Sequence, residues 1–273
     1  MNKQSLEFLY SRSKNLSLTK EQTESKVCQD ILIALIGSDP EIRKRVAFKG
    51  GIVIDYLSKG KRGYTKDIDF DFVKYPLSND GIIDFFNRIS KKPPYKNIAI
   101  EVETISDLRH KNYLGKRVNL LFRDNKDAFH LVVDIGVFLS LFRKNIEIEY
   151  ELKLGNKTNI FINPVERIVA EKLSTFAIYG TDNTRDKDLF DAYFFLVSYT
   201  IDLQLVKKML TTILVKKNHY YKTFKNAATA IIDTLTNKRY VKFLNDSEKN
   251  WTDVPASIVI EKIKGLLQNL ISF

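Results

Sequence analysis

The sequence has one cysteine, three histidines and no long apolar run among its 273 residues. The single thiol, Cys28, excludes an internal disulfide framework and fits a reducing compartment. No apolar run approaches the roughly 18 to 20 residues that a membrane helix needs, and the first ten residues lack the apolar core of a signal peptide. The histidines and the cysteine do not have metal-binding spacing. We therefore expect a soluble, cytoplasmic protein with no membrane association.

Acidic residues are scarce relative to basic ones, with 33 Asp and Glu against 44 Lys and Arg and a net charge of +11. Residues 201–273 hold eleven Lys and one Arg against six acids, which leaves +6 on about a quarter of the chain. Such charge favours a polyanionic partner, above all nucleic acid. The aromatic residues among these lysines could stack on bases or belong to the core: Tyr220, Tyr221, Phe224 and Tyr240. The alternative is that the lysines are only solubilising.

Carboxylates gather in the strand expected at residues 67–72, where acidic and apolar residues alternate. Strand side chains point to opposite faces in turn, so Asp67, Asp69 and Asp71 share one face. Neighbouring carboxylates repel one another unless a cation lies between them, and oxygen ligands of this kind suit Mg²⁺. The pattern predicts a magnesium site. The alternative is an exposed edge strand that its charges keep soluble.

A glycine pair, Gly50-Gly51, precedes this strand and opens a short apolar helix. Without a Cβ atom, backbone N–H groups can approach a phosphate closely, and the helix dipole at that end favours negative charge. Glycines followed by clustered carboxylates therefore predict a site for a phosphate and its metal ion.

The segment 47–162 is rich in predicted strands, and the remainder is helical. We expect a mixed or antiparallel α+β sheet, with a helix near residues 80–90. After residues 67–72, the predicted strands are Ile98–Thr104, Arg117–Phe122, His130–Gly136, Ile146–Leu152 and Asn159–Ile162. This change in pattern predicts two domains, 1–162 with helices at its start and 163–273 as a helical bundle.

Asp134 lies within the otherwise apolar strand H-L-V-V-D-I-G-V-F. A charge in such a strand is costly unless it binds a metal ion or pairs with a cation. Asp134 is therefore a candidate third metal ligand, and the alternative is an ion pair with a lysine or arginine.

The helical part begins with Asn163 as the expected N-cap and a helix that ends at Gly180. Lys172 falls on the apolar stripe of this helix, so it either extends along its stem to solvent or presents its charge to a phosphate group. The next helix, with Thr184 as its expected cap, places Arg185, Asp188 and Asp191 broadly together. Alone, this second pattern is typical of an ordinary helix with ion pairs.

The motifs K-G-G followed by T-x-D-I-D-F, and P-x-E-x-x-x-A-E-K-L followed by R-D-K-D-L-x-D, together resemble the AbiEii/AbiGii abortive-infection toxin family, which is similar to the MenT toxins. The resemblance covers roughly residues 47–197. It implies a nucleotidyltransferase domain of the polymerase-β type with a mixed sheet, followed by the helical bundle. The family usually has Thr or Ser after the second glycine, but this chain has Ile52, which leaves backbone N–H groups to contact the phosphate.

The resemblance also implies roles for individual residues. The implied catalytic residues are Asp67, Asp69, Lys172, Asp134 and Asp191, with Asp188 as the alternative to Asp191. The implied nucleotide-binding residues are Lys49, Gly50, Gly51, Arg62, Lys172 and Arg185. The implied metal ligands are Asp67, Asp69 and Asp134, which would hold Mg²⁺ while a nucleoside triphosphate serves as substrate.

The function implied is that of a Mg²⁺-dependent nucleotidyltransferase, the toxin of a toxin–antitoxin or abortive-infection system. It would transfer a nucleoside monophosphate to an acceptor, with RNA favoured by the basic charge and tRNA suggested by the family. An antitoxin or operon partner is expected by the same resemblance. Two alternatives stay open: a small-molecule nucleotidyltransferase, and a non-catalytic nucleic-acid-binding protein with this fold.

Overall fold

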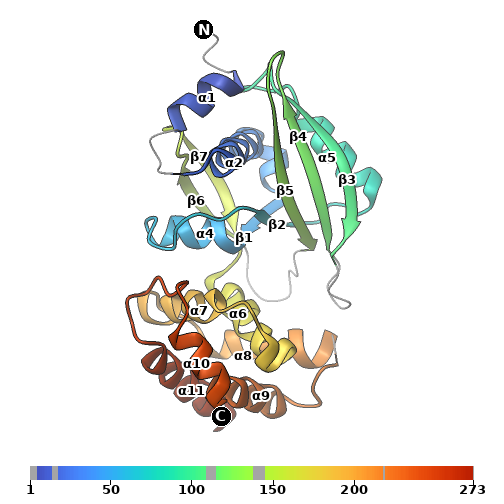
Figure 1. Cartoon of the computed structure of the whole chain (residues 1–273). Helices are drawn as coiled ribbons and strands as arrows, with labels where there is room; N and C mark the ends of the chain where they lie inside the picture. Colours follow the sequence, from blue (N-terminus) through green and yellow to red (C-terminus); the bar gives the residue numbers. More distant parts are fainter. Residues whose placement is uncertain (1–4, 14–17, 109–114, 138–144, 218, 273) are drawn as a thin grey trace. The chain divides into compact units, whose positions relative to one another are not determined.

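The computed structural model describes residues 5–13, 18–108, 115–137, 145–217 and 219–272 (Figure 1). The chain divides into two compact units, Met1–Asn163 and Pro164–Phe273. No helix in the described part of the chain is long and apolar enough to cross a membrane.

The first unit is built on a mixed sheet of seven strands, with the order β3-β4-β5-β2-β1-β7-β6 among the described residues. The strands are β1 (Val46–Lys49), β2 (Ile68–Phe72), β3 (Ala99–Asp107), β4 (Lys116–Arg123), β5 (Ala128–Val137), β6 (Ile146–Glu151) and β7 (Lys157–Ile162). The pairs β1·β7 and β2·β5 are parallel, and the other neighbours are antiparallel. Since β2 lies between β5 and β1, the alternative that the acidic strand is an exposed edge is wrong.

Helices cover the sheet of the first unit. They are α1 (Leu6–Ser13), α2 (Lys20–Ser38), α3 (Pro40–Arg43), α4 (Gly50–Leu57) and α5 (Asn79–Ile89). Helix α2 packs on β5 and β7, and α5 packs beside β3 (Figure 1). The apolar residues of β2 form the core on one face of the sheet: Phe70 and Phe72 are fully buried, and their rings lie 6.1 and 5.0 Å from the ring of Phe85 on α5. The alternation in β2 therefore separates a buried apolar face from an acidic one, as its sequence predicts.

Each strand predicted from residue 67 onward is present, with ends that differ by at most three residues. Strand β1 was not predicted as a strand. Its four residues V-A-F-K are all buried, so it shows no alternation of apolar and polar residues that could reveal it.

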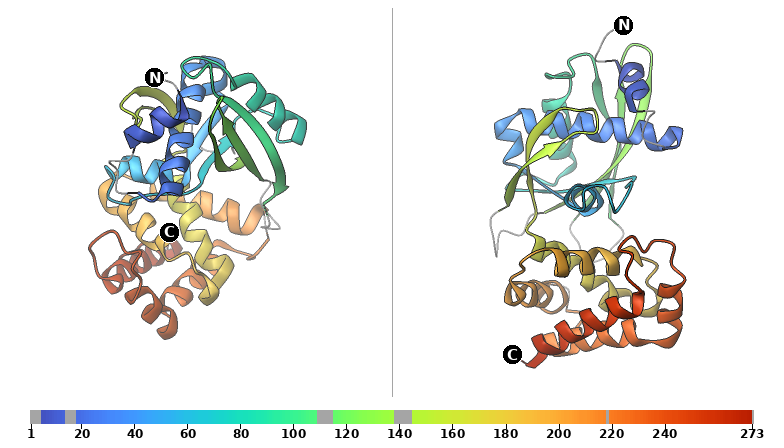
Figure 2. Two further views of the ribbon diagram at one scale, coloured as in Figure 1. Left: turned by 45° about the horizontal axis from the view of Figure 1, so that its top comes forward. Right: turned by 90° about the vertical axis from the view of Figure 1, so that its left-hand side faces the viewer.

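In its described residues the second unit contains helices and no strand (Figure 2). They are α6 (Val165–Tyr179), α7 (Lys187–Ser198), α8 (Leu203–Thr211), α9 (Phe224–Thr236), α10 (Lys238–Asn245) and α11 (Ala256–Ser272), with a 3-10 turn at Gly180–Asp182 and a π-helical turn at Thr212–Lys217. Helix α6 contacts α7, α8 and α9.

Two of the expected helix caps are wrong. Helix α6 begins after Pro164, and the side chain of Asn163 instead donates a hydrogen bond to Asp71 in the first unit. Helix α7 begins at Lys187, where the carboxylate of Asp186, in place of Thr184, accepts the backbone N–H. In both cases the predicted residue is of a type that can form a cap, but a nearby residue occupies the N-cap position because the helix begins later than predicted.

Candidate active site

The glycine pair lies where β1 joins α4, and Gly50 lies against the carboxylate of Asp69. Gly50 has φ = +66°, and a Cβ atom there would lie 2.1 Å from Oδ2 of Asp69. A Cβ atom on Gly51 would lie 2.7 Å from Nη1 of Arg62 and 2.5 Å from Oγ1 of Thr65. Both positions therefore need glycine. At Gly50 the reasons are the positive φ and the nearby carboxylate of Asp69, and at Gly51 the reason is the close approach of Arg62 and Thr65. The side chain of the N-cap residue, Lys49, makes no capping hydrogen bond to α4.

Three predicted metal ligands come from β2 and β5. Asp69 is paired in register with Asp134 on the neighbouring parallel strand, and Asp67 immediately precedes β2. Partial burial, followed by the negative charge of Asp134, raises the pKa of Asp67. The sheet thus brings these carboxylates close enough to repel one another, which favours a cation at this place.

Arg117 of β4 supplies a positive charge to the same carboxylates. Its Nε and Nη2 donate hydrogen bonds of 2.8 and 2.7 Å to the two oxygens of Asp134, and Nη2 lies 3.8 Å from Oδ2 of Asp67. These hydrogen bonds raise the pKa of Arg117. The alternative of an ion pair at Asp134 is therefore confirmed. The partner could have been identified only from the strand register, which sets Arg117 opposite Asp134.

The carboxylates do not form a ready-made three-ligand metal site. In the described ranges no three His, Cys, Asp or Glu side chains are grouped so that they could hold a metal ion. Mg²⁺ usually takes only one or two protein carboxylates and completes its shell with water and phosphate oxygens. Asp67 and Asp69 fit that requirement, while Asp134 is engaged by Arg117.

The third acid of residues 67–72 has an internal role. Asp71 is fully buried, with Nζ of Lys49 at 2.8 Å and Nδ2 of Asn163 at 3.0 Å. These two contacts supply the partners that a buried carboxylate needs. They also join the ends of β1, β2 and β7. Lys49 is a predicted nucleotide-binding residue, and in this structure its ammonium forms an ion pair with Asp71.

Helix α2 holds the segment that leads into Asp67. Nε2 of Gln29 donates to the carbonyl oxygens of Thr65 and Lys66, at 2.9 and 3.0 Å, and Oγ of Ser25 donates to the latter at 2.9 Å. Gln29 is fully buried. These bonds fix the backbone immediately before the first carboxylate.

A second polar cluster lies in the second unit and is called the Lys172 cluster, comprising Lys172, Asp188 and Asp191. Nζ of Lys172 lies 2.5 Å from Oδ1 of Asp188 and 3.0 Å from Oδ2 of Asp191. Asp191 is fully buried, and Asp188 is nearly so. The ammonium thus lies between two carboxylates, and the alternative that the lysine extends to solvent is wrong. Arg185, the remaining predicted residue of this unit, precedes α7 and is exposed.

Most lysines in the described part of residues 201–273 are exposed, whereas the aromatic residues among them differ in burial. Tyr220 is 40% exposed, but Tyr240 is buried, so Tyr240 belongs to the core and does not stack on bases. The hydroxyl of Tyr221 donates to the carbonyl oxygen of Ala177. Exposed lysines in this region include Lys208, Lys216, Lys222, Lys225, Lys238, Lys242, Lys249 and Lys262.

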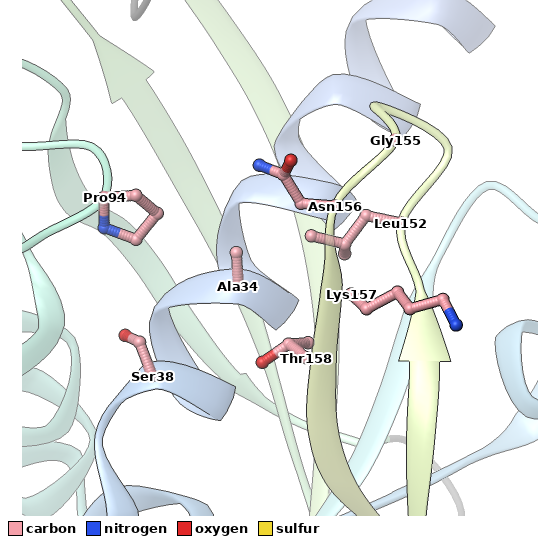
Figure 3. Close-up of a pocket in the computed structure, with 8 residues that line it drawn as sticks. All are labelled: Ala34, Ser38, Pro94, Leu152, Gly155, Asn156, Lys157 and Thr158. Carbon is pink, nitrogen blue, oxygen red and sulfur yellow. The ribbon is translucent and has the colours of Figure 1, made fainter.

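A pocket of about 510 Å³ lies in the first unit away from the predicted site residues (Figure 3). It is lined by Ala34, Ser38, Pro94, Leu152, Gly155, Asn156, Lys157 and Thr158. None of these is a carboxylate or a predicted phosphate contact, so the pocket offers no support for the predicted chemistry.

Residues 33–261 match the family model described as nucleotidyl transferase AbiEii toxin, type IV toxin–antitoxin system. No curated protein matches the chain. Two solved structures are similar at 16% identity: "Crystal structure of putative nucleotidyltransferase from H. pylori", over 93% of this chain and 95% of that one with a TM-score of 0.48, and "Crystal structure of JHP933 from Helicobacter pylori", over 94% and 99% with a TM-score of 0.44.

Proposed function

The chain belongs to the AbiEii nucleotidyl transferase toxin family of type IV toxin–antitoxin systems, and on that premise we propose that it transfers a nucleoside monophosphate from a triphosphate to RNA in a Mg²⁺-dependent reaction. It is a nucleotidyltransferase. The metal, the acceptor and the roles of single residues are the proposal. An antitoxin partner is proposed from the same membership.

One observation carries the proposal: Gly50 brings the start of α4 against Asp69. With φ = +66° and no Cβ atom, Gly50 lets the start of α4 approach the carboxylate of Asp69 closely. A helix N-terminus attracts phosphate, and a carboxylate attracts the cation that accompanies phosphate. The close approach of the two supports a site for a metal-bound triphosphate.

In the proposed reaction an RNA hydroxyl oxygen forms a bond to the α-phosphorus, and the bond to the β-phosphate oxygen breaks, which releases pyrophosphate. Bound Mg²⁺ would activate the hydroxyl and stabilise the leaving group. Asp67 and Asp69 would hold the ion, and the N–H groups of α4 would orient the phosphates. Asp134 would accept the hydroxyl proton or join the metal site once Arg117 releases it.

The second unit is proposed to contribute in two ways. Lys172 would neutralise charge on the nucleotide phosphates, with Asp188 and Asp191 fixing its ammonium. The exposed lysines of residues 201–273 support an RNA acceptor, because phosphate neutralisation dominates nonspecific RNA affinity. A small-molecule nucleotidyltransferase for a cationic acceptor is less well supported by such a surface.

The test is to incubate the pure protein with labelled nucleoside triphosphates, Mg²⁺ and total RNA. Labelled RNA supports the proposal, and Asp69→Asn is the matched inactive control. Transfer to a small molecule alone would favour the small-molecule alternative. No transfer to any acceptor, together with RNA binding, would favour a non-catalytic binding protein.

A further inference from the structure

The only tryptophan of the chain, Trp251, lies in the segment between α10 and α11, outside both sequence motifs of the family resemblance. Its indole Nε1 donates a hydrogen bond of 3.0 Å to Oδ1 of Asp191. The other oxygen of the same carboxylate lies 3.0 Å from Nζ of Lys172. The indole and the ammonium therefore hold opposite oxygens of one fully buried carboxylate.

The segment that carries Trp251 is held by its own hydrogen bonds. Oδ1 of Asn250 accepts from the backbone N–H and the hydroxyl of Thr252, and Nδ2 of Asn250 donates to the carbonyl oxygen of Val254. The indole ring packs on Phe194 of α7, with ring centres 5.1 Å apart. Side-chain to backbone bonds of this kind define the turn, and the contact with Phe194 orients the indole ring that the turn carries.

The same segment also reaches the start of α7. Nζ of Lys249 lies 2.9 Å from Oδ1 of Asp186, and the hydroxyl of Ser247 donates to the other oxygen of that carboxylate. Asp186 is the N-cap of α7, and Asp191 lies about 1.4 turns further along the chain in the same helix. Residues 247–251 thus fix the helix that carries Asp188 and Asp191 at two places.

From this geometry we propose that Trp251 is a positioning residue for the Lys172 cluster. Its indole N–H orients the carboxylate of Asp191, and this carboxylate orients the ammonium of Lys172. Without the donor, Oδ1 of Asp191 would be a buried acceptor that has lost a partner, and the carboxylate would change its orientation towards Nζ of Lys172. The consequence for nucleotide transfer rests on the proposed function.

The test compares Trp251→Phe with Phe194→Leu in the full chain. The first variant keeps a ring and removes the N–H donor, whereas the second removes a ring contact and keeps the donor. Trp251→Phe should lower kcat/KM for the nucleotide about tenfold, the size expected for one buried hydrogen bond to a charged group. It should cause no further loss in an Asp191→Asn background, since both changes break the same link. Phe194→Leu keeps the indole donor, so Asp191→Asn should still lower kcat/KM when it is added to Phe194→Leu.

Two measurements do not depend on activity. Unfolding free energies of Trp251→Phe, Asp191→Asn and the double variant should be non-additive. The protein labelled with 5-fluorotryptophan should give one ¹⁹F resonance, because Trp251 is the only tryptophan. This resonance should shift in Asp191→Asn and Lys172→Met, and should stay in place in the control Asp233→Asn, a change at an exposed residue of α9.

Additive unfolding energies with an unmoved resonance would overturn the positioning role. So would wild-type kcat/KM in a folded Trp251→Phe protein. If the wild-type protein transfers nucleotide to no acceptor, the proposed function fails, but the stability cycle and the resonance still decide whether Trp251 positions Asp191 and Lys172.

Discussion

Arg117 holds Asp134 with two parallel hydrogen bonds of 2.8 and 2.7 Å and lies 3.8 Å from Asp67. The guanidinium therefore provides the positive charge that the carboxylates of β2 and β5 need when no other cation is near. A divalent cation that used Asp134 would compete with this arginine for the carboxylate.

The first prediction is that Arg117→Gln increases the affinity for divalent cations, because the cation no longer competes with the guanidinium for Asp134. Mn²⁺ binding measured by electron paramagnetic resonance is the direct readout. Arg123→Gln is the matched control, since Arg123 is on the same strand and its Nε lies 3.6 Å from Glu101 at an exposed pair. An unchanged or weaker Mn²⁺ affinity in Arg117→Gln would contradict competition at this place.

The second prediction concerns Asp67 and Asp69. Asp67→Asn and Asp69→Asn should each abolish nucleotide transfer, because each removes a charge that would hold the metal ion. Transfer of labelled nucleotide to RNA is the measurement. Retention of a tenth of wild-type activity in both variants would show that these carboxylates are not the ligands.

The third prediction is a pH dependence of stability at Asp67. Its pKa is raised in the folded protein, so its proton stabilises the fold below the ordinary pKa, and this contribution is lost as the pH rises through the raised value. Asp67→Asn should therefore be at least as stable as the wild type at about pH 8, with the gain absent near pH 3, where the carboxyl is protonated in both states. Thermal unfolding at the two pH values checks this, and a variant that is less stable only at the higher pH would refute it.

The fourth prediction separates backbone strain from the close approach at Gly50. Gly50→Ala should abolish transfer, because its Cβ atom would collide with Asp69 in addition to straining a positive φ. Gly60→Ala is the control: Gly60 has φ = +81°, and a Cβ atom there would meet nothing within 4 Å. The control should lose about 1–2 kcal/mol of stability and keep its activity. Equal activities in the two variants would remove the argument for Gly50.

The fifth prediction concerns Lys172. Lys172→Met should lower the unfolding free energy by about 3–5 kcal/mol, because it leaves two buried carboxylates without their cation. The control Lys264→Met, which breaks the pair of Lys264 with the exposed Glu261 on α11, should cost less than about 1 kcal/mol. Urea unfolding measures both. In the fraction that stays folded, nucleotide affinity should fall at least tenfold by calorimetry. Wild-type affinity would show that Lys172 has a structural role alone.

The sequence alone determined the local parts of the candidate site. The alternation in β2 sets Asp67 and Asp69 on the face opposite Phe70, because a strand has a period of two. The role of the glycine pair can be predicted from the sequence for a similar reason, since a positive φ and a close approach both require a residue without a side chain. These features depend on a few neighbouring residues, so they can be predicted without knowing what packs against them.

Only the tertiary structure decided which residues complete each cluster. Arg117 meets Asp134 through the register of two strands, and Trp251 meets Asp191 from sixty residues further along the chain. Asp71 looks in sequence like its two acidic neighbours, yet it is buried against Lys49 because β1 lies beside it. Such contacts are set by strand register and by the path of connecting segments, which hydrophobic periodicity does not encode.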